Sequence, residues 1–474
     1  MYERIPGFSN LETAYHLAEK NSIGLYLGAG VNLLPTEWWT TRKRRYATYT
    51  WEELLRALYE KNREQLTATF EELLDQCRDK EGNADWADLA SKLVGQLSIP
   101  EFVGQIDDII YGCIPRGDRY GRLSKVLLDQ APTLHATICF SAEIKERTDN
   151  SWTFRRNRKV GMVITPNYDF FFGAGWTRYQ TFKEHWSIRT PPSSRKGETR
   201  ADKGTVNYIH GYVPYTSFML LRRSDLKDAA SLARKLKKQD DPLSEYLRGQ
   251  FSDRGRSLLE KYDGTEPAPK SLRKALVKGL NNAIGQKDLY NKQRFKGVAI
   301  NDATQAMIRQ NRQDEKSIPR LNRALLDDAF PDEIEEYQKD LVLKKEQYER
   351  RYAQGGFALE KLEEAVGRYK LIFLGTSFED KPLRDMLGKY RDKQHFAVVK
   401  SGSEAAQRAK RLGVCTVEVK YYSDIAGVLE KVYCAELARN TEECQKVDPS
   451  TPKAYWERLM KGPTKTSEKK KGVR

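Results

Sequence analysis

The chain has 474 residues, of which 39% are hydrophobic and 11% are aromatic. This is enough apolar material for a substantial core, so a largely disordered chain is excluded. Lys and Arg number 82 against 66 Asp and Glu, a net charge of +16. No run approaches the 18 apolar residues of a membrane-spanning helix, and the first residues lack the apolar stretch of a secretory signal. We therefore expect a cytoplasmic protein with no membrane contact.

The six cysteines, at positions 77, 113, 139, 415, 434 and 444, form no Cys-x-x-Cys pair. In a chain without a secretory signal this pattern favours reduced, mostly buried thiols. A structural zinc site needs four grouped Cys or His ligands, and none of the five histidines accompanies a cysteine pair. We therefore expect no bound metal.

In chain order, the periodicity first predicts a helix over Leu11–Glu19 and a buried strand over Ile23–Leu27 that ends in Gly-Ala-Gly. The sequence then predicts an aromatic and basic loop over residues 36–50, with Trp38 and Trp39. Thr50 then precedes WEELLRALYEKN as a helix N-cap, and helical patterns continue to about residue 130.

Strand patterns return at Val160–Thr165 and Val206–Gly211, and a charged, helical stretch follows to about residue 356. The last strands are predicted at Tyr369–Gly375, His395–Lys400 and Val414–Lys420, with helices between them. Alternating strands and helices favour an α/β fold: a Rossmann-like parallel sheet with helices on both faces, plus a mainly helical insertion.

The predicted organisation has four parts. Residues 1–228 form the first part of the Rossmann-like domain, with a small helical subdomain at about 56–130. Residues 229–360 form the helical, basic insertion, residues 361–434 complete the sheet, and residues 435–474 are an extension with a basic tail.

The ends of four predicted strands carry residues suited to binding a nucleotide. Gly28, Ala29 and Gly30 follow the first strand, and such a turn lets a backbone approach a diphosphate. The alternative is an ordinary tight turn, because the third glycine of a dinucleotide fingerprint is missing.

Thr165, Asn167 and Asp169 follow the next strand, where an amide and a carboxylate can read a carboxamide. The alternative there is an Asx turn that caps the strand end.

His210 lies beside Gly211 at a third strand end. Its ordinary pKa near 6.5 suits proton transfer, although a lone histidine is more often structural. Gly375, Thr376 and Ser377 follow the fourth strand, where the hydroxyl groups suit ribose or phosphate oxygens; the alternative is a capped turn.

Taken in order, LGAGVN, ITPNYD, IHG and LGTS resemble the signature elements of the sirtuin family. The sequence FLGTSFEDKPLRDML resembles the bacterial sirtuin-like subgroup of anti-phage NAD hydrolases, in which an acidic residue follows the turn. The resemblance covers about residues 10–60, 155–228 and 361–432. Asn32 stands where the family usually has Ser, and the cysteine quartet of the deacylase zinc ribbon is absent, so protein deacylation is not expected.

The resemblance implies an NAD⁺ hydrolase that cleaves the bond between nicotinamide and ribose, with NAD as substrate and NAD depletion as its defensive effect. It implies catalytic roles for Asn167, His210 and Asp169. It also implies NAD contacts from Gly28, Ala29, Gly30, Asn32, Thr165, Gly375, Thr376 and Ser377.

The implied partners are further copies of the chain and a companion such as a HerA-type ATPase or an Argonaute-like protein. Two other functions stay open: a non-catalytic sensor of NAD or ADP-ribose, and a nucleic-acid-binding scaffold that uses the basic insertion and the WWTTRKRRYATY loop. That loop is equally suited to a subunit interface, which is rich in Trp, Tyr and Arg.

Overall fold

The computed structural model describes most of the chain. The described residues are 5–32, 50–78, 84–94, 99–111, 131–146, 152–177, 186–189, 203–213, 221, 226–238, 241–286, 300, 302–311, 318–334, 345–442 and 451–461. The predicted loop at 36–49 and the basic tail after residue 461 lie outside them.

The described chain divides into two compact units. The first comprises Met1–Leu54, Gly112–Tyr212 and Val342–Arg474, and the second comprises Leu55–Tyr111 and Val213–Leu341. The sequence analysis places a small helical subdomain at about 56–130 within the first part, and residues 55–111 group with residues 213–341 in the second unit. Residues 342–360, assigned to that insertion, belong to the first unit.

The first unit is built on a seven-stranded sheet in the order β5-β6-β4-β1-β7-β8-β9, in which every neighbouring pair is parallel. Its strands are β1 (Ile23–Leu27), β4 (Val160–Thr165), β5 (Trp186–Arg189), β6 (Gly204–Tyr208), β7 (Lys370–Leu374), β8 (Phe396–Lys400) and β9 (Cys415–Val419). All residues of β1 and β4 are buried, as expected for a parallel sheet with both faces covered. The predicted Rossmann-like α/β fold is confirmed.

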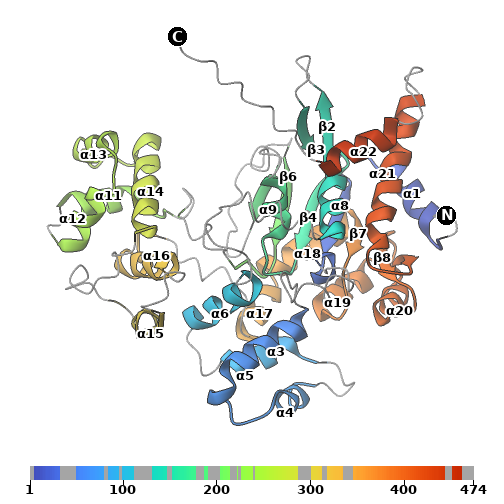
Figure 1. Ribbon diagram of the computed structural model, residues 1–474, viewed down its shortest axis with the longest axis horizontal. Coiled ribbons are helices and arrows are strands. Elements are labelled where there is room, and N and C mark those ends of the chain that lie inside the picture. The colour runs from blue at the N-terminus through green and yellow to red at the C-terminus, as the bar shows by residue number, and fades with distance from the viewer. Residues whose placement is uncertain are drawn as a thin grey trace. The chain divides into compact units, whose positions relative to one another are not determined.

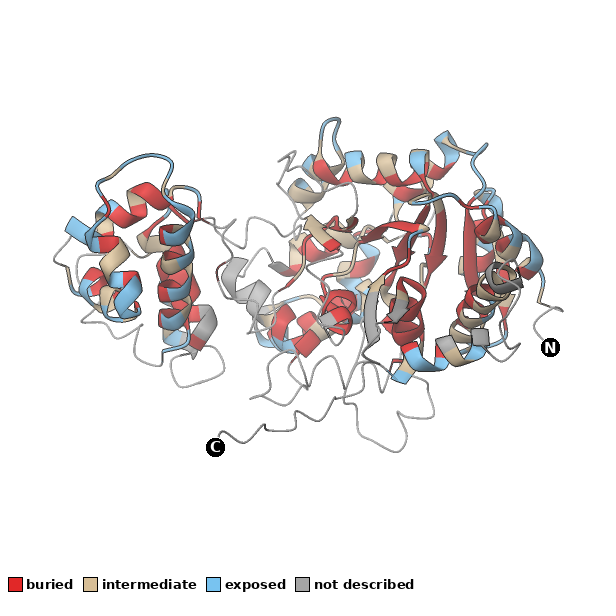
Figure 2. Cartoon of the chain, turned by 90° about the horizontal axis from the view of Figure 1, so that it is seen from above, coloured by how far each residue is buried: buried red, intermediate tan, exposed pale blue. Residues whose placement is uncertain are grey.

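Helices cover both faces of this sheet (Figure 2). The helices of the first unit are α1 (Phe8–His16), η2 (Ala29–Asn32), α8 (Pro132–Phe140), α9 (Phe171–Thr177), α17 (Lys345–Tyr352), α18 (Phe357–Arg368), α19 (Lys381–Lys389), α20 (Glu404–Arg411), α21 (Asp424–Glu442) and α22 (Thr451–Lys461). On one face, α18, α19 and α20 pack their apolar residues against Tyr26, Ile164 and Phe373 of the sheet. A small antiparallel hairpin, β2 (Ala142–Glu146) and β3 (Trp152–Arg156), completes the unit (Figure 1).

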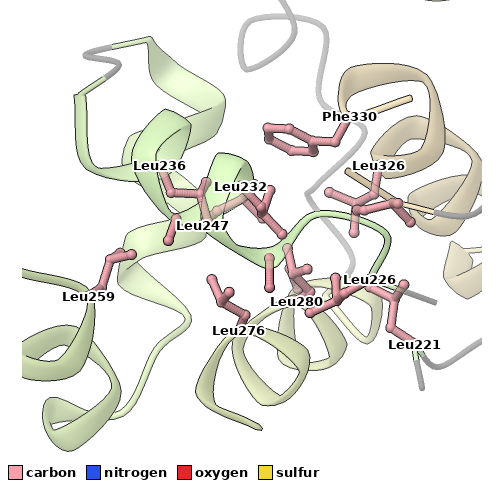
Figure 3. Packing of buried hydrophobic residues seen from close by; sticks show 14 of the residues in the cluster. Leu221, Leu226, Leu232, Leu236, Leu247, Leu259, Leu276, Leu280, Leu326 and Phe330 are labelled. Atoms are coloured by element: carbon pink, nitrogen blue, oxygen red, sulfur yellow. The ribbon is translucent and has the colours of Figure 1, made fainter. Parts of the chain in front are cut away.

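The second unit is helical among its described residues. It contains most of α3 (Trp51–Asn62), then η3 (Arg63–Gln65), α4 (Phe70–Asp75), α5 (Trp86–Val94), α6 (Ile99–Tyr111), α11 (Ala229–Lys238), α12 (Pro242–Gly249), α13 (Asp253–Glu260), α14 (Lys270–Ile284), α15 (Asp302–Asn311) and α16 (Ile318–Ala329). Leucines at helical spacing in α11, α12, α14 and α16 build an apolar core, in which Leu232, Leu276 and Leu280 point toward one another (Figure 3). The insertion therefore has a hydrophobic core of its own.

None of the helices in the described part of the chain combines the length and the apolar character of a membrane span. Four cysteines are described, all as free thiols: Cys77 and Cys139 are buried, and Cys415 and Cys434 are half-buried.

Candidate active site

The strand order places the candidate residues at one edge of the sheet. From β1 the chain continues to β4 on one side, whereas β7, on the other side of β1, is followed by β8. In open α/β sheets, ligands bind outside the carboxyl ends of the strands where the order changes direction. The predicted residues follow the carboxyl ends of β1, β4, β6 and β7, which are adjacent strands.

The glycine turns after β1 and β7 pack directly against each other. The Gly28 amide donates to the Leu374 carbonyl at 2.9 Å, and the Gly30 amide donates to the Gly375 carbonyl at 3.0 Å. A side chain at Gly28 or Gly375 would overlap the backbone of the opposite turn. Close packing thus explains these glycines, and the amides of Gly28 and Gly30 are already used. A diphosphate at this turn has to be held by other groups, such as the Ala29 amide.

The turn after β4 is fixed by the Thr165 hydroxyl. It donates to the Leu27 carbonyl at 2.7 Å and accepts from the Asn167 amide at 3.1 Å. Thr165 is buried and Asn167 is half-buried. Thr165 therefore links the ends of β1 and β4 and sets the position of Asn167, a structural role beside the predicted contact with NAD.

Asp169 joins the same two strand ends. Its Oδ2 accepts from Asn32 Nδ2 at 2.9 Å, and its Oδ1 accepts from the Phe171 amide at 3.0 Å at the start of α9. The second bond is the Asx turn weighed as the alternative. Burial raises the pKa of Asp169 to about 6, and these hydrogen bonds limit the rise. Both carboxylate oxygens of Asp169 thus already accept hydrogen bonds. Asp169 could accept a hydrogen bond from a carboxamide only after these bonds have rearranged.

His210, two residues after β6, is 2% exposed. The aromatic rings of Trp51, Tyr168, Tyr348 and Tyr352 surround its ring at centroid distances of 6.3, 6.2, 5.6 and 5.8 Å. His210 Nε2 is hydrogen-bonded to the Tyr352 hydroxyl at 2.9 Å. Burial lowers the pKa of His210 to about 4, and the nearby Pro166 backbone opposes this shift. The imidazole is therefore neutral at pH 7 and a weaker base than an ordinary histidine, although it can still exchange hydrogen bonds with a hydroxyl group.

The turn after β7 brings a half-buried carboxylate, that of Asp380, to the same edge. Gly375 and Phe378 adopt left-handed backbone angles, φ +62° and +59°, and burial of the Phe378 ring against Phe373 offsets the strain. Asp380, which follows this turn, accepts a hydrogen bond from the Tyr348 hydroxyl. Burial raises the pKa of Asp380 to about 6, opposed first by the Tyr348 hydrogen bond.

Thr376 and Ser377 lie in this turn. Thr376 is half-buried and Ser377 is exposed. The Ser377 carbonyl accepts from Arg408 at 3.4 Å. The Thr376 hydroxyl lies 3.5 Å from the Leu374 carbonyl, to which it can donate. The binding role of both hydroxyls stays a prediction.

The structure brings together residues far apart in the sequence. The Ile209 amide donates to the Thr165 carbonyl at 3.0 Å, which joins the ends of β6 and β4. Asn167 stands between Pro166 and Tyr168, and both of these neighbours border the His210 ring. Asn167 and His210 therefore belong to one region of the sheet edge.

Sequence reasoning missed Trp51, Tyr348, Tyr352 and Asp380 as members of this region. The two tyrosines stand four residues apart in EQYERRY, a spacing that places them on one face of a helix. Their position in a charged helical stretch pointed instead to the insertion.

The comparisons with known proteins bear on part of this site. Residues 329–419 match the family model of a SIR2-like domain. This SIR2-like segment contains α17, β7, the turn with Gly375–Ser377, and Asp380. The turn at Gly28, Asn167 and His210 lie outside the match. A search of curated proteins found no match.

Proposed function

We propose that the protein is an NAD⁺ hydrolase that cleaves the bond between nicotinamide and ribose. The observation that carries this proposal is the grouping of Asn167 and His210 at the carboxyl edge of the sheet, next to the SIR2-like segment. SIR2-like domains use NAD. The neutral imidazole of His210 supplies a hydrogen-bonding group that can orient a hydroxyl, and Asn167 supplies both a donor and an acceptor.

The chemistry makes modest demands on these residues. When the C–N bond breaks, its electron pair goes to the pyridinium nitrogen, and nicotinamide leaves as a neutral molecule. Water then adds to the anomeric carbon and loses one proton, giving ADP-ribose. Under the proposal, Asn167 orients the water or the ribose, His210 orients or deprotonates a hydroxyl or the water, and Asp169 orients the carboxamide. Ala29, Thr376 and Ser377 bind the diphosphate and the adenosine side.

The test is product analysis after incubation of the full chain with NAD. We expect nicotinamide and ADP-ribose in equal amounts, separated by chromatography. The assay includes lysate from cells that carry the genomic neighbours, because an enzyme that depletes NAD has to be restrained. Calorimetry on the purified chain can show NAD binding while the product assay, with and without that lysate, shows no product. This result would contradict hydrolysis and support a non-catalytic sensor. The engagement of His210 Nε2 by Tyr352 is the observation that favours a sensor.

As part of the same proposal, the protein acts in the cytoplasm as an anti-phage effector that depletes NAD. It would do so as a homo-oligomer with a companion of the HerA-type ATPase or Argonaute-like class. The resemblance of the sequence to the defence subgroup supports this role.

Helix α14 offers a surface for a nucleic-acid partner. It exposes Lys270, Lys274 and Lys278 at four-residue intervals, about 6 Å apart along the helix axis. Two of these lysines and Arg273 lie near the helix N-terminus, where positive charge opposes the helix dipole. The helix dipole therefore does not account for the stripe, and the stripe supports, as a second proposal, the nucleic-acid-binding scaffold.

We expect the combined Lys270→Ala, Lys274→Ala and Lys278→Ala variant to bind oligonucleotides more weakly. The slope of log affinity against log salt should fall by about three, one unit for each phosphate contact. The matched control replaces Lys393, Lys400 and Lys420, three exposed lysines of the first unit, by Ala. Equal losses in both variants would show a general charge effect and no site on α14.

A further inference from the structure

Helix α17 is a short, charged helix that carries two tyrosines toward the candidate site. Its sequence is KEQYERRY, and none of its residues is fully buried. It ends close to Gly355 and Gly356, and Gly355 has a positive φ of +76°. The glycine pair joins α17 to the well-packed α18, whose Ala358 and Leu362 belong to the core. The helix is thus attached to α18 through a tight turn, and its main apolar contact with the core is the partly buried Tyr352.

The two tyrosines hold α17 on the site through their hydroxyls. Tyr352 bonds to His210 Nε2 at 2.9 Å, and Tyr348 donates to Asp380. Their rings lie 4.6 Å apart and both pack against the His210 ring. These contacts join a helix of the chain's last third to the end of β6, across 142 residues of sequence.

These contacts place His210 in a blocked state. A histidine that orients or deprotonates a substrate hydroxyl needs a ring nitrogen in hydrogen-bond reach of that hydroxyl. Whichever tautomer the ring adopts, Nε2 already has the Tyr352 hydroxyl as its partner. The Pro166 backbone lies at the ring as well, and the residue is 2% exposed. A substrate hydroxyl can reach Nε2 only after Tyr352 has moved away.

We propose that α17 is an autoinhibitory lid, in which the Tyr352 hydroxyl holds the place on His210 that a hydroxyl of the substrate or the attacking water takes during catalysis. This inference rests on the proposed function, because the activity that the lid would regulate is NAD cleavage at that same site. Opening breaks the hydrogen bonds of the two hydroxyls, including a bond from Tyr352 to Asp380, and moves no fully buried residue of the helix. A partner that binds the charged outer face of α17 can therefore shift the equilibrium.

The experiment compares Tyr352→Phe with the wild-type chain. The substitution keeps the ring and removes the hydroxyl that bonds to His210. The first readout is the rate of tryptic cleavage after Arg350 and Arg351 under native conditions, which reports opening of α17. The second is the rate of nicotinamide release from NAD. Tyr390→Phe is the matched control. The Tyr390 hydroxyl donates a comparable hydrogen bond of 3.1 Å to Glu363, and this bond does not involve His210.

We expect Tyr352→Phe to raise both rates about fivefold, the change that corresponds to the loss of one hydrogen bond, with no change in Tyr390→Phe. Tyr348→Phe, which removes one hydrogen bond to Asp380, should act in the same direction. Faster tryptic cleavage without NAD cleavage in any variant would support the lid and count against the proposed function alone. Unchanged tryptic cleavage, or slower nicotinamide release in Tyr352→Phe, would overturn the lid.

Discussion

Replacement of Gly375 by Ala should lower the free energy of unfolding by about 3 kcal/mol or more, the sum of two separate costs. The first is conformational, because Gly375 has φ +62°, where an L side chain costs about 1–2 kcal/mol. The second is steric, because the new methyl group would overlap the Val31 amide and the Gly30 backbone. Backbone atoms of a packed turn have little freedom to move away, and overpacking of this kind costs about 1–3 kcal/mol.

Two further glycines separate these costs. Gly402 has φ +71° with open space around it, so Gly402→Ala should carry the conformational cost alone. Gly28 lacks a positive φ but would overlap the Gly375 carbonyl, so Gly28→Ala should carry the steric cost alone. Denaturant unfolding of the three variants measures each loss. A Gly402→Ala protein as unstable as Gly375→Ala would show that the contact between the two turns contributes nothing.

This prediction bears on how the Gly-Ala-Gly motif is interpreted. In the sequence, the motif suggests a backbone that approaches a diphosphate. In the structure, the backbone that it approaches is the turn after β7, and two of its amides donate there. The same glycine pattern thus serves the convergence of β1 and β7, which forms the sheet edge on which a nucleotide site depends.

The strands of the sheet were predictable where burial dominates the sequence pattern. β1 and β4 have the predicted bounds, because IGLYL and VGMVIT are mostly apolar, are buried throughout and are bounded by turn residues. β7, β8 and β9 begin one residue later than predicted, and β7 and β9 also end one residue earlier. β6 begins at Gly204 and ends at Tyr208, so the stretch 209–211 belongs to the turn that carries His210.

Elements with polar or short sequences were missed. The hairpin strands β2 and β3, AEIKE and WTFRR, carry charges at half of their positions together, a pattern that does not predict core strands. β5 has only four residues at the edge of the sheet. In these elements, pairing with a neighbouring strand sets the conformation, and a pattern within one segment does not report it.

The candidate site was predictable for a related reason. In a parallel sheet, the carboxyl ends of the strands lie at one edge, so residues that follow strands meet there wherever they stand in the sequence. Tyr348 and Tyr352 follow no strand. Their contact with His210 depends on how α17 packs, which the spacing of residues in one segment cannot reveal.

The second large effect concerns His210, and a second buried histidine supplies its control. His395 is also 2% exposed, and burial likewise lowers its pKa to about 4. It precedes β8, at the amino edge of the sheet, and its Nδ1 accepts a hydrogen bond from the Leu371 amide at 3.2 Å. The two histidines therefore share burial and protonation state but lie at opposite edges of the same sheet.

We expect His210→Ala to stay folded and to lower the rate of NAD cleavage on the order of 10²-fold or more, as for removal of a positioned base, and Asn167→Ala to do the same. His395→Gln should instead lower stability by about 1–3 kcal/mol, because the Leu371 amide loses its acceptor, and should keep the rate per folded molecule. Initial rates of nicotinamide release, with the folded fraction determined by circular dichroism, separate the two effects. Full activity in both His210→Ala and Asn167→Ala would show that the active site does not lie at the carboxyl edge of the sheet. Loss of activity in all three variants would mean that the assay reports the integrity of the sheet, because His395 reaches the opposite edge only through the strands themselves.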